Sequence, residues 1–241
     1  MFRNIFKRNH VHEIDKTNLP MHIGIIMDGN GRWAKKRGMP RNFGHRAGAE
    51  TLKKITTYCD EIGIKAVTAY TFSTENWKRP QAEIDGIMAL LREYLNDYKK
   101  NLGDKNAVIK VIGDISVLDE DIRSLIAETE DFTKDNTGVV LSLAINYGGQ
   151  DEIVRSVKEV VENGEKITAE NIENHLYTRN LPPVDLIIRP SGEKRLSNFL
   201  LWQSAYAELW YDDVLWPDFT TDDLNKAISD YQKRSRRYGG V

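Results

Sequence analysis

A short segment near the N-terminus combines residue types that can bind a phosphate group and a metal ion. Its apolar run, residues 23–27, ends at Asp28, and a Gly-Asn-Gly turn then leads into a stretch rich in Lys and Arg. This order is typical of a strand, a tight turn and the start of a helix. Backbone N–H groups at such a turn can bind phosphate or diphosphate, and Asp28 could reach a Mg2+ ion held by the same phosphates.

Arg32 and Arg41 follow the turn and can add charge-assisted hydrogen bonds to the same anion. The turn also matches the dinucleotide-binding pattern G-x-G-x-x-G/A at Gly29, Gly31 and Ala34. A single match of this kind is weak evidence, and Glu75, the acidic residue after the next strand-like run, lies far beyond the usual spacing of roughly 20 residues. Phosphate binding is the favoured interpretation, with dinucleotide binding and a purely structural turn left open.

A second group of anion-binding residue types lies far along the chain. It contains Arg189, Ser191, Arg195 and Ser197. An arginine side chain can hold phosphate oxygens in two-point contacts, so this group predicts a second anion site. Two such sites suggest a reaction that joins two diphosphate substrates. The alternative is a surface network in which these arginines pair with Glu193 and Asp185.

Glu208 is a further candidate, because it lies between Tyr206 and Trp210 in the sequence. A carboxylate in such surroundings needs a partner, which can be a metal cation or an arginine side chain. The residues alone leave both partners open.

Strand-like and helix-like patterns alternate along the chain and must bring these residues together. The strand-like runs are residues 23–27, 66–72, 107–112, 139–145 and 184–188, with a weaker one at 208–211. The helix-like patterns occupy residues 45–62, 81–102, 119–134, 150–162 and 221–237. This alternation predicts one α/β domain with a mostly parallel central sheet flanked by helices. Ligands collect at the carboxyl ends of parallel strands, where Asp28, Ser73 and Arg189 would meet.

Length and composition limit the classes of protein to consider. With 241 residues, 40 % of them hydrophobic, the chain can bury one good-sized core. Its net charge of −2 gives no reason to expect a nucleic-acid partner. Cys59 is the single cysteine, which indicates a reducing compartment. We find no apolar stretch long enough to span a bilayer and no signal peptide, and therefore expect a soluble, cytoplasmic protein.

Residues 1–18 form a basic amphipathic N-terminal segment, ahead of a domain that we expect at residues 19–241. Phe2, Ile5 and Phe6 alternate with basic residues, a composition that suits an anionic membrane surface. A solvated terminus explains the same residues and is favoured because the segment is short.

Several longer motifs resemble those of one enzyme family. In chain order they are His22-Ile-Gly-Ile-Ile-Met-Asp-Gly-Asn-Gly-Arg-Trp-Ala34, Gly44-His-Arg-Ala-Gly48, Tyr70-Thr-Phe-Ser-Thr-Glu-Asn-Trp-Lys-Arg-Pro80, Asn146-Tyr-Gly-Gly149 and Asp185-Leu-Ile-Ile-Arg-Pro-Ser-Gly-Glu-Lys-Arg-Leu-Ser-Asn-Phe-Leu-Leu-Trp-Gln203. Together they resemble the motifs of the cis-prenyltransferases, the undecaprenyl diphosphate synthase family. The similarity extends from about residue 19 to residue 240, and several long motifs in this order leave little room for chance.

The resemblance implies a Mg2+-dependent homodimer with an apolar tunnel. Such an enzyme extends farnesyl diphosphate with isopentenyl diphosphate, releases diphosphate and makes a long-chain polyprenyl diphosphate, in bacteria undecaprenyl diphosphate, the carrier lipid of cell-wall synthesis. Its lipid product would allow contact with the inner face of the membrane. The first anion site would hold the allylic diphosphate and the second site isopentenyl diphosphate.

The resemblance also implies roles for individual residues. Asp28 and Asn76 would be catalytic, and Asp28 and Glu208 would share the Mg2+ ion. The implied substrate-binding residues are Gly29, Asn30, Gly31, Arg32, Trp33, Arg41, His45, Ser73, Thr74, Glu75, Trp77, Arg79, Arg189, Arg195, Leu196 and Ser197. Asn76 would act at proton removal, although asparagine is a poor base and a diphosphate oxygen is an alternative acceptor.

Two expectations about larger elements come from the same resemblance. Residues 86–91 and 139–143 would wall the tunnel, although their periodicity alone favours ordinary core. Arg237 and Gly239 in the C-terminal tail would reach the isopentenyl diphosphate site of the neighbouring subunit. A basic helix end followed by glycine is also ordinary helix chemistry.

Several other functions are alternatives to this interpretation. A shorter-chain cis-prenyltransferase is one alternative, and a non-catalytic binding subunit of the family is a remote one. A nucleotide-dependent oxidoreductase is a third, excluded if dinucleotides fail to bind. An all-helical trans-prenyltransferase would need an Asp-Asp-x-x-Asp motif, which neither Asp212-Asp213 nor Asp222-Asp223 completes. Pro190 stands where many relatives have Thr, and proline removes a backbone N–H donor there.

Overall fold

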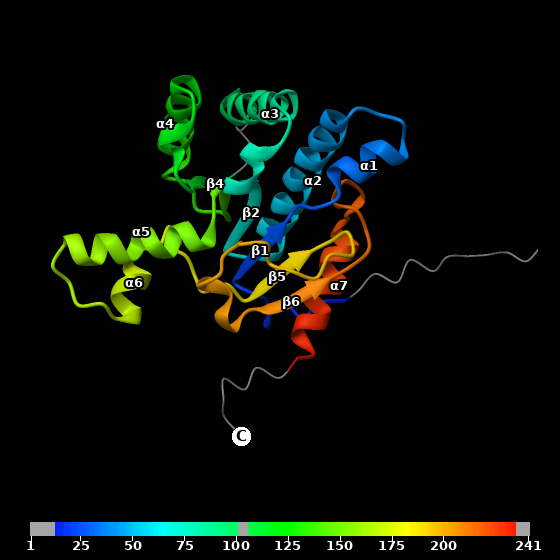
Figure 1. Cartoon of the computed structure of the whole chain (residues 1–241). Helices are drawn as coiled ribbons and strands as arrows, with labels where there is room; N and C mark the ends of the chain where they lie inside the picture. The colour runs from blue at the N-terminus through cyan, green and yellow to red at the C-terminus, as the bar shows by residue number, and fades with distance from the viewer. Residues whose placement is uncertain (1–12, 101–105, 235–241) are drawn as a thin grey trace, which may run out of the picture.

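The computed structural model describes residues 13–100 and 106–234, which contain one central sheet. The strands lie in the order β3-β4-β2-β1-β5-β6, and every neighbouring pair is parallel (Figure 1). They are β1 (His22–Ile26), β2 (Ala66–Ser73), β3 (Val108–Ile112), β4 (Val140–Tyr147), β5 (Leu186–Arg189) and β6 (Glu208–Tyr211). The prediction of an α/β domain with a mostly parallel sheet is confirmed.

Seven α-helices of the described part connect and cover these strands. They are α1 (Asn30–Lys36), α2 (Arg41–Ile62), α3 (Gln81–Lys100), α4 (Glu120–Thr133), α5 (Gly149–Glu162), α6 (Ala169–His175) and α7 (Thr221–Gln232). All five predicted helices are present. The short helix α6 was not predicted, because seven residues show too little periodicity. None of the described helices has both the length and the apolar composition that crossing a bilayer requires.

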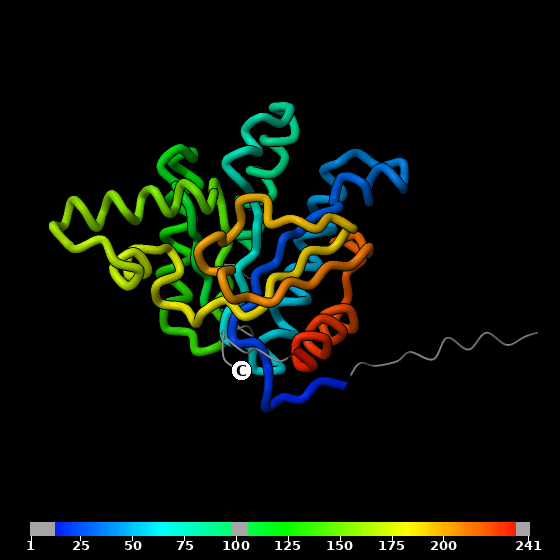
Figure 2. Tube along the Cα trace, turned by 60° about the horizontal axis from the view of Figure 1, so that its bottom comes forward, coloured from blue at the N-terminus to red at the C-terminus, as the bar shows by residue number. Residues whose placement is uncertain are grey.

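The sheet separates two apolar layers. One face packs against α2, α3, α4 and α7 and contains the larger core. The other face is covered by residues 196–200 and nearby aromatic rings, where Phe199 stacks on Tyr70 with 4.6 Å between ring centroids. Figure 2 shows the gold and orange segment that follows β5 lying across the near side of the sheet. Gly24 allows this close packing, because a Cβ there would lie 3.2 Å from the Phe199 ring.

The parallel order gives the sheet two different edges, named here the carboxyl edge and the amino edge. All six strands end at the carboxyl edge and begin at the amino edge. The chain connects β1 to β2 on one side, whereas it connects β5 to the neighbouring β6 on the other. Ligand sites of open α/β sheets form where connections diverge in this way. The carboxyl ends of β1 and β5 are therefore where a site is expected.

His22 opens β1 at the amino edge and is completely buried. Its Nε2 lies 2.7 Å from Thr68 Oγ1, and its Nδ1 lies 2.8 Å from the Pro182 carbonyl oxygen. Burial lowers the pKa of His22 to about 4, although the Pro182 carbonyl opposes this effect. His22 is therefore neutral near pH 7, and its two contacts connect the start of β1 to β2 and to the segment before β5.

Candidate active site

Five polar side chains meet where β1 and β5 end, and they form what we name the β1–β5 cluster: Asp28, Arg32, Arg189, Ser191 and Ser197. Arg189 is 4 % exposed and donates to Asp28 Oδ2 and to Ser197 Oγ, each at 2.8 Å. Arg32 donates to the Ser191 carbonyl oxygen at 2.9 Å and lies 3.3 Å from Asp28 Oδ1. The two anion sites predicted from the sequence therefore adjoin, with Asp28 between them.

The charges of this cluster keep Asp28 ionised. Burial alone would raise the pKa of Asp28, but the bond from Arg189, the charge of Arg32 and the Gly29 N–H, at 2.7 Å, hold that pKa below its ordinary value. Arg189 Nε is buried and has no hydrogen-bond partner among the described residues. Because that atom is enclosed, a ligand cannot contact it in this structure; Arg32, which is 46 % exposed, is the arginine at this position that an anion can reach directly.

The loop after β5 holds an unusual backbone conformation. Four of its non-glycine residues have positive φ: Ser191 (80°), Ser197 (50°), Asn198 (65°) and Leu200 (45°). Such conformations cost roughly 1 to 3 kcal/mol each, cluster at functional sites and persist only where neighbours fix them. Here the Asn198 carbonyl oxygen accepts from Gly149 N at 2.7 Å, and Asn198 Oδ1 accepts from Gln150 N at 2.9 Å. The start of α5 therefore fixes the loop.

A second group, named the α2–α3 cluster, consists of Arg41, His45, Arg79 and Glu83. Glu83 is 6 % exposed and accepts from Arg79 Nη1 at 2.9 Å. Its carboxylate also lies 3.3 Å from His45 Nε2 and 3.4 Å from Arg41 Nη1. Burial lowers the pKa of His45 and Arg79 adds to this effect, although Glu83 opposes it. We therefore assign a neutral His45 that donates from Nε2, because a carboxylate can only accept.

Glu83 is a site residue that the sequence analysis missed. The available signal was its spacing of four residues from Arg79, which is the spacing of helical ion pairs, although Arg79 itself precedes α3. An acidic residue in the first turn of a helix is also ordinary helix chemistry. The pattern alone therefore did not distinguish Glu83 from a surface carboxylate.

Glycines near the start of α2 bring α1 and α2 into direct contact. A Cβ at Gly44 would collide with the Asn30 carbonyl oxygen, and a Cβ at Gly48 would lie 2.5 Å from Asn30 Oδ1. Arg41 lies over Gly31, where a Cβ would be 2.9 Å from Arg41 Nε. The Gly44–Gly48 motif therefore serves to hold Arg41 and His45 beside the glycine turn, where Gly29 has a φ of 102°.

The residues after β2 are held by a local capping arrangement. Asn76 Oδ1 accepts from Ser73 N at 3.2 Å, and the Ser73 side chain accepts from Asn76 N. Trp77 Nε1 donates to Asn146 Oδ1 at 2.8 Å, which connects this turn to the end of β4. Because its amide oxygen already accepts a backbone N–H, Asn76 shapes the turn that carries Arg79.

Thr74 and Glu75 connect the same turn to α5 and to the loop after β5. Thr74 Oγ1 donates to Asp151 Oδ2 at 3.4 Å. Asn198 Nδ2 donates to Glu75 Oε1 at 3.1 Å. The predicted residues that follow β2 are thus linked by hydrogen bonds to the loop of the β1–β5 cluster.

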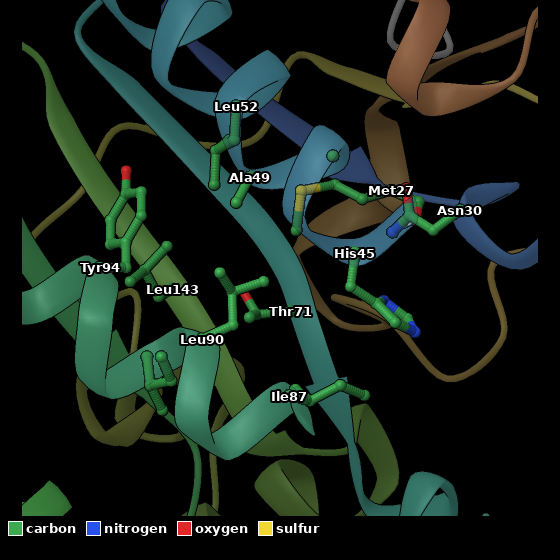
Figure 3. Close-up of a pocket in the computed structure, with 12 residues that line it drawn as sticks. Met27, Asn30, His45, Ala49, Leu52, Thr71, Ile87, Leu90, Tyr94 and Leu143 are labelled. Atoms are coloured by element: carbon green, nitrogen blue, oxygen red, sulfur yellow. Dashed lines mark hydrogen bonds between the residues drawn. The ribbon is translucent and has the colours of Figure 1, made fainter. Parts of the chain in front are cut away.

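An apolar cavity of about 70 Å³ lies between α2 and α3 (Figure 3). Its lining residues are Met27, Asn30, His45, Gly48, Ala49, Leu52, Thr71, Ile87, Leu90, Leu91, Tyr94 and Leu143. In Figure 3, Asn30 and His45 lie at one end and Tyr94 at the other. The predicted tunnel walls supply Ile87, Leu90, Leu91 and Leu143 to this lining, and His45 places the cavity next to the α2–α3 cluster.

Glu208 lies at the opposite edge of the sheet from Asp28. The strand register pairs Glu208 with Leu186 and Leu186 with Ile23, so Glu208 is level with the start of β1. Its carboxylate accepts from Arg234 Nη1. The predicted metal site shared by Asp28 and Glu208 is therefore wrong within a single chain, and the arginine alternative holds. Within residues 13–100 and 106–234, no group of three His, Cys, Asp or Glu side chains could hold a metal ion.

Three other predicted residues lie at the margin of the two clusters. Trp33 Nε1 donates to Asp218 Oδ1 at 2.6 Å, so its indole is engaged outside both clusters. Leu196 packs against the smaller core layer. Arg195 is largely exposed and pairs with Glu193 at 2.5 Å, as the surface-network alternative predicted, whereas Arg189 does not follow that alternative. Arg237, Gly239 and residues 1–12 lie outside the described residues.

Fold and geometry thus define an α/β protein that gathers anion-binding side chains beside an apolar cavity. Comparison with known proteins extends this description over almost the whole chain. A family model described as "Putative undecaprenyl diphosphate synthase" matches residues 26–239. An isoprenyl transferase of Clostridium perfringens is 54 % identical over 233 residues, which cover 94 % of this chain and 92 % of that protein.

A second relative and two solved structures agree with this match. The ditrans,polycis-undecaprenyl-diphosphate synthase ((2E,6E)-farnesyl-diphosphate specific) of Haemophilus influenzae is 46 % identical, over 95 % of this chain and 99 % of that protein. Lavandulyl diphosphate synthase from Lavandula x intermedia, solved with dimethylallyl diphosphate, superposes with a TM-score of 0.88 at 34 % identity, over 93 % of this chain and 100 % of that one. A probable undecaprenyl diphosphate synthase from Campylobacter jejuni gives 0.79 at 36 % identity, over 92 % and 99 %. The chain therefore belongs to the undecaprenyl diphosphate synthase family, which confirms the resemblance of its motifs.

Proposed function

We propose that this chain catalyses cis-prenyl chain elongation. It condenses isopentenyl diphosphate onto an allylic diphosphate, farnesyl diphosphate as the first primer, and makes a long-chain polyprenyl diphosphate of the undecaprenyl type. The observation that carries this proposal is the adjacency of two cationic clusters to each other and to an apolar cavity. A cavity with convergent charged groups at one end suits a substrate with a diphosphate head and a hydrocarbon chain.

The two substrates divide between the two sides of Asp28. Arg41 and the glycine turn adjoin the cavity and would hold the allylic diphosphate, whose chain enters the cavity. Arg189, Arg195 and Ser197 would hold isopentenyl diphosphate, which has only a short hydrocarbon part. The direct Arg189–Asp28 bond brings these two head-group positions together.

The reaction breaks the C–O bond to the allylic diphosphate, forms a C–C bond to the isopentenyl double bond and releases one proton. Arg41 and Arg32 stabilise the negative charge that develops on the leaving diphosphate. A diphosphate oxygen accepts the proton in this proposal, because Asn76 is a poor base and its amide oxygen already accepts from Ser73 N. Arg79 holds that part of the site in place through Glu83.

A Mg2+ ion fits this site through Asp28 alone. Mg2+ in phosphate-transfer sites is bound by one or two carboxylates, with substrate oxygens and water as further ligands. The lowered pKa of Asp28 keeps a carboxylate available beside the glycine turn. When bound, the ion would neutralise charge on the leaving diphosphate.

The chain length of the product sets a requirement on the cavity. Its volume of about 70 Å³ is small for a long hydrocarbon chain. For elongation we therefore expect α3 to move away from α2, or the lining side chains to change rotamers. Ile87 and Leu91 on α3 are the side chains that such a movement would displace.

We propose that the chain forms a homodimer in the cytoplasm. Its lipid product would bring the enzyme into contact with the inner face of the membrane. Tyr206 is 73 % exposed and borders a groove of about 970 Å³ that Leu181, Pro183 and Trp202 also line. A second copy of the chain would cover this face. Sedimentation should therefore show a dimer for the wild type and a larger monomer fraction for Tyr206→Glu. A monomeric wild type would contradict the homodimer.

The function is tested with radiolabelled isopentenyl diphosphate, farnesyl diphosphate and Mg2+. Products are resolved by chain length and by double-bond geometry, and the Asp28→Asn variant serves as the control for background labelling. Long chains with new cis double bonds are the expected result. Absence of incorporation would contradict the proposal, as would new bonds that are all trans; chains that stop early would support the shorter-chain alternative.

A further inference from the structure

Glu83 is a buried carboxylate at the border of a site that must bind anions. Three groups surround it: Arg79 at 2.9 Å, His45 at 3.3 Å and Arg41 at 3.4 Å. A carboxylate that is 6 % exposed needs such partners. Its position is nevertheless unexpected, because a fixed negative charge beside Arg41 weakens the binding of a negatively charged head group.

Arg41 is held less firmly than Arg79. Charge-assisted hydrogen bonds are ordinarily about 2.7 to 2.9 Å long, which the Arg79–Glu83 bond satisfies and the Arg41–Glu83 distance does not. The Arg41 side chain is 61 % exposed, and its guanidinium lies over Gly31 of the glycine turn. Arg41 can therefore move from Glu83 to a diphosphate without leaving Glu83 unpaired, since Arg79 and His45 remain.

We propose that Glu83 competes with diphosphate for Arg41 and thereby promotes release of the diphosphate after each condensation. The proposal rests on the function proposed above. With diphosphate present, Arg41 binds the phosphate oxygens and Glu83 keeps Arg79 and His45. When diphosphate leaves, Arg41 returns to the carboxylate. No bond is made or broken in this exchange, and its consequence is that diphosphate binds less tightly than it would beside a neutral side chain.

The place of Glu83 on α3 connects this exchange to the cavity. Glu83 lies four residues before Ile87 and eight before Leu91, so the three share one helix face, and Ile87 and Leu91 line the cavity. The head-group end and the hydrocarbon end of the substrate therefore meet the same helix. Release at one end leaves the growing chain in contact with α3 at the other.

Coulomb's law sets the expected size of the effect. A guanidinium between two anions keeps them roughly 7 Å apart, and at effective dielectric constants between those of water and of a protein surface their repulsion changes affinity by roughly three- to fiftyfold. Glu83→Gln should therefore bind inorganic diphosphate about three- to fiftyfold more tightly than the wild type. Both kcat and KM for farnesyl diphosphate should fall, because release becomes slower.

The test measures inorganic diphosphate binding by titration calorimetry on the full chain, beside steady-state kinetics. Glu93→Gln is the matched control, because Glu93 also joins α3 to α2, through Arg46, but is exposed and distant from the glycine turn. This control should bind diphosphate as the wild type does. In an Arg41→Ala background, Glu83→Gln should change diphosphate affinity less than it does in the wild-type background, because competition for Arg41 is gone and only the direct repulsion between Glu83 and diphosphate remains.

Each other result decides against the proposal. Unchanged or weaker diphosphate binding by Glu83→Gln, beside a wild type that binds it, would mean that Glu83 only holds Arg41 in place, and would leave the proposed function intact. A wild type that binds no diphosphate would overturn both. Should Glu83→Gln not fold, Glu83→Asp keeps the charge and moves the carboxylate away from Arg41. This variant must then bind diphosphate more tightly than the wild type, and equal or weaker binding refutes the competition.

Discussion

Both edges of the central sheet carry charged and polar side chains, but the two edges use them differently. At the amino edge, His22 engages both ring nitrogens, Asp185 accepts from Met21 N at 2.7 Å, and Glu208 pairs with Arg234. These groups bind partners within the chain. At the carboxyl edge, the side chains of Arg32 and Arg41 are 46 % and 61 % exposed and lie beside the glycine turn.

The difference shows that the number of charges does not define a binding site. What distinguishes the carboxyl edge is the presence of solvent-exposed arginine side chains beside backbone held in uncommon conformations. The first turn of α1, which follows β1, and the loop after β5 both lie at this edge. At the amino edge, where the strands begin, the polar side chains hydrogen-bond to neighbouring segments of the chain.

The largest expected effect is at Asp28. Asp28→Asn should lower turnover by about 10² to 10³-fold, because a neutral amide is a much poorer ligand for the Mg2+ ion that would neutralise charge on the leaving diphosphate. Its stability should fall less than that of an alanine variant, since the amide oxygen can still accept from Arg189 although the charge is lost. Condensation assays at saturating Mg2+ and thermal unfolding measure the two quantities. Turnover within a few-fold of the wild type would remove Asp28 from the mechanism.

Asp28→Ala measures how much the Asp28 side chain contributes to the stability of the fold, apart from its role in catalysis. It leaves Arg189, which is 4 % exposed, without its anionic partner, and we expect a loss of about 2 to 3 kcal/mol in the free energy of unfolding. Urea unfolding of the alanine and asparagine variants gives the comparison. Equal stability of the two variants would show that the Asp28–Arg189 pair does not hold this edge together.

The next effect is a pH dependence at the amino edge. The pKa of His22 is about 4 in the folded chain and about 6.5 when unfolded, so the unfolded state binds more protons between these values and stability rises with pH. The contribution is fully present above pH 6.5, and about 3 kcal/mol of it is lost as the pH falls to 4. The lowered pKa of Asp28 makes its own contribution disappear only below about pH 4.

Urea unfolding of the wild type and of His22→Gln between pH 4 and pH 7.5 measures this term. The stability difference between the two proteins should decrease as the pH falls from 6.5 to 4. A difference that stays constant over this range would show that His22 titrates normally and that the amino edge is open to protons and water.

Smaller effects should separate the two substrates at the carboxyl edge. Arg41→Ala should raise the KM for farnesyl diphosphate, and Arg195→Ala the KM for isopentenyl diphosphate, each by roughly ten- to a hundredfold, because each loses one charged hydrogen bond. Both arginines are largely exposed, so thermal unfolding should be almost unchanged. Equal effects of both variants on both substrates would contradict two head-group positions.

The smallest effect is expected from the ion pair at the amino edge. Arg234→Gln removes the partner of Glu208, and because the pair is partly exposed the free energy of unfolding should fall by about 0.2 to 1 kcal/mol. Diphosphate affinity, measured by calorimetry, should remain that of the wild type. A clear loss of diphosphate affinity would show that the two edges are coupled.

Local patterns in the sequence predicted the strands, five of the helices and the carboxyl-edge location of Asp28 and Arg189. Those features depend on residue periodicity and on strand direction, both of which are readable along the chain. The position of Glu208 was not readable in this way, since it depends on the register of β6 against β5. Glu83 was missed for a related reason: its three partners come from α2 and from the turn after β2, and only the packing of α3 brings them together.

The central claim, that the carboxyl edge binds substrate and the amino edge does not, is tested most directly by backbone amide NMR. The 15N-labelled protein is titrated with an unreactive analogue of farnesyl diphosphate and, separately, with isopentenyl diphosphate. We predict large shifts for the amides of residues 29–32 and 41–45 with the first ligand and of residues 189 and 191–197 with the second, and none with either ligand for those of His22, Lys65 and Asp185. Shifts of similar size at both edges, or largest at the amino edge, would contradict the central claim.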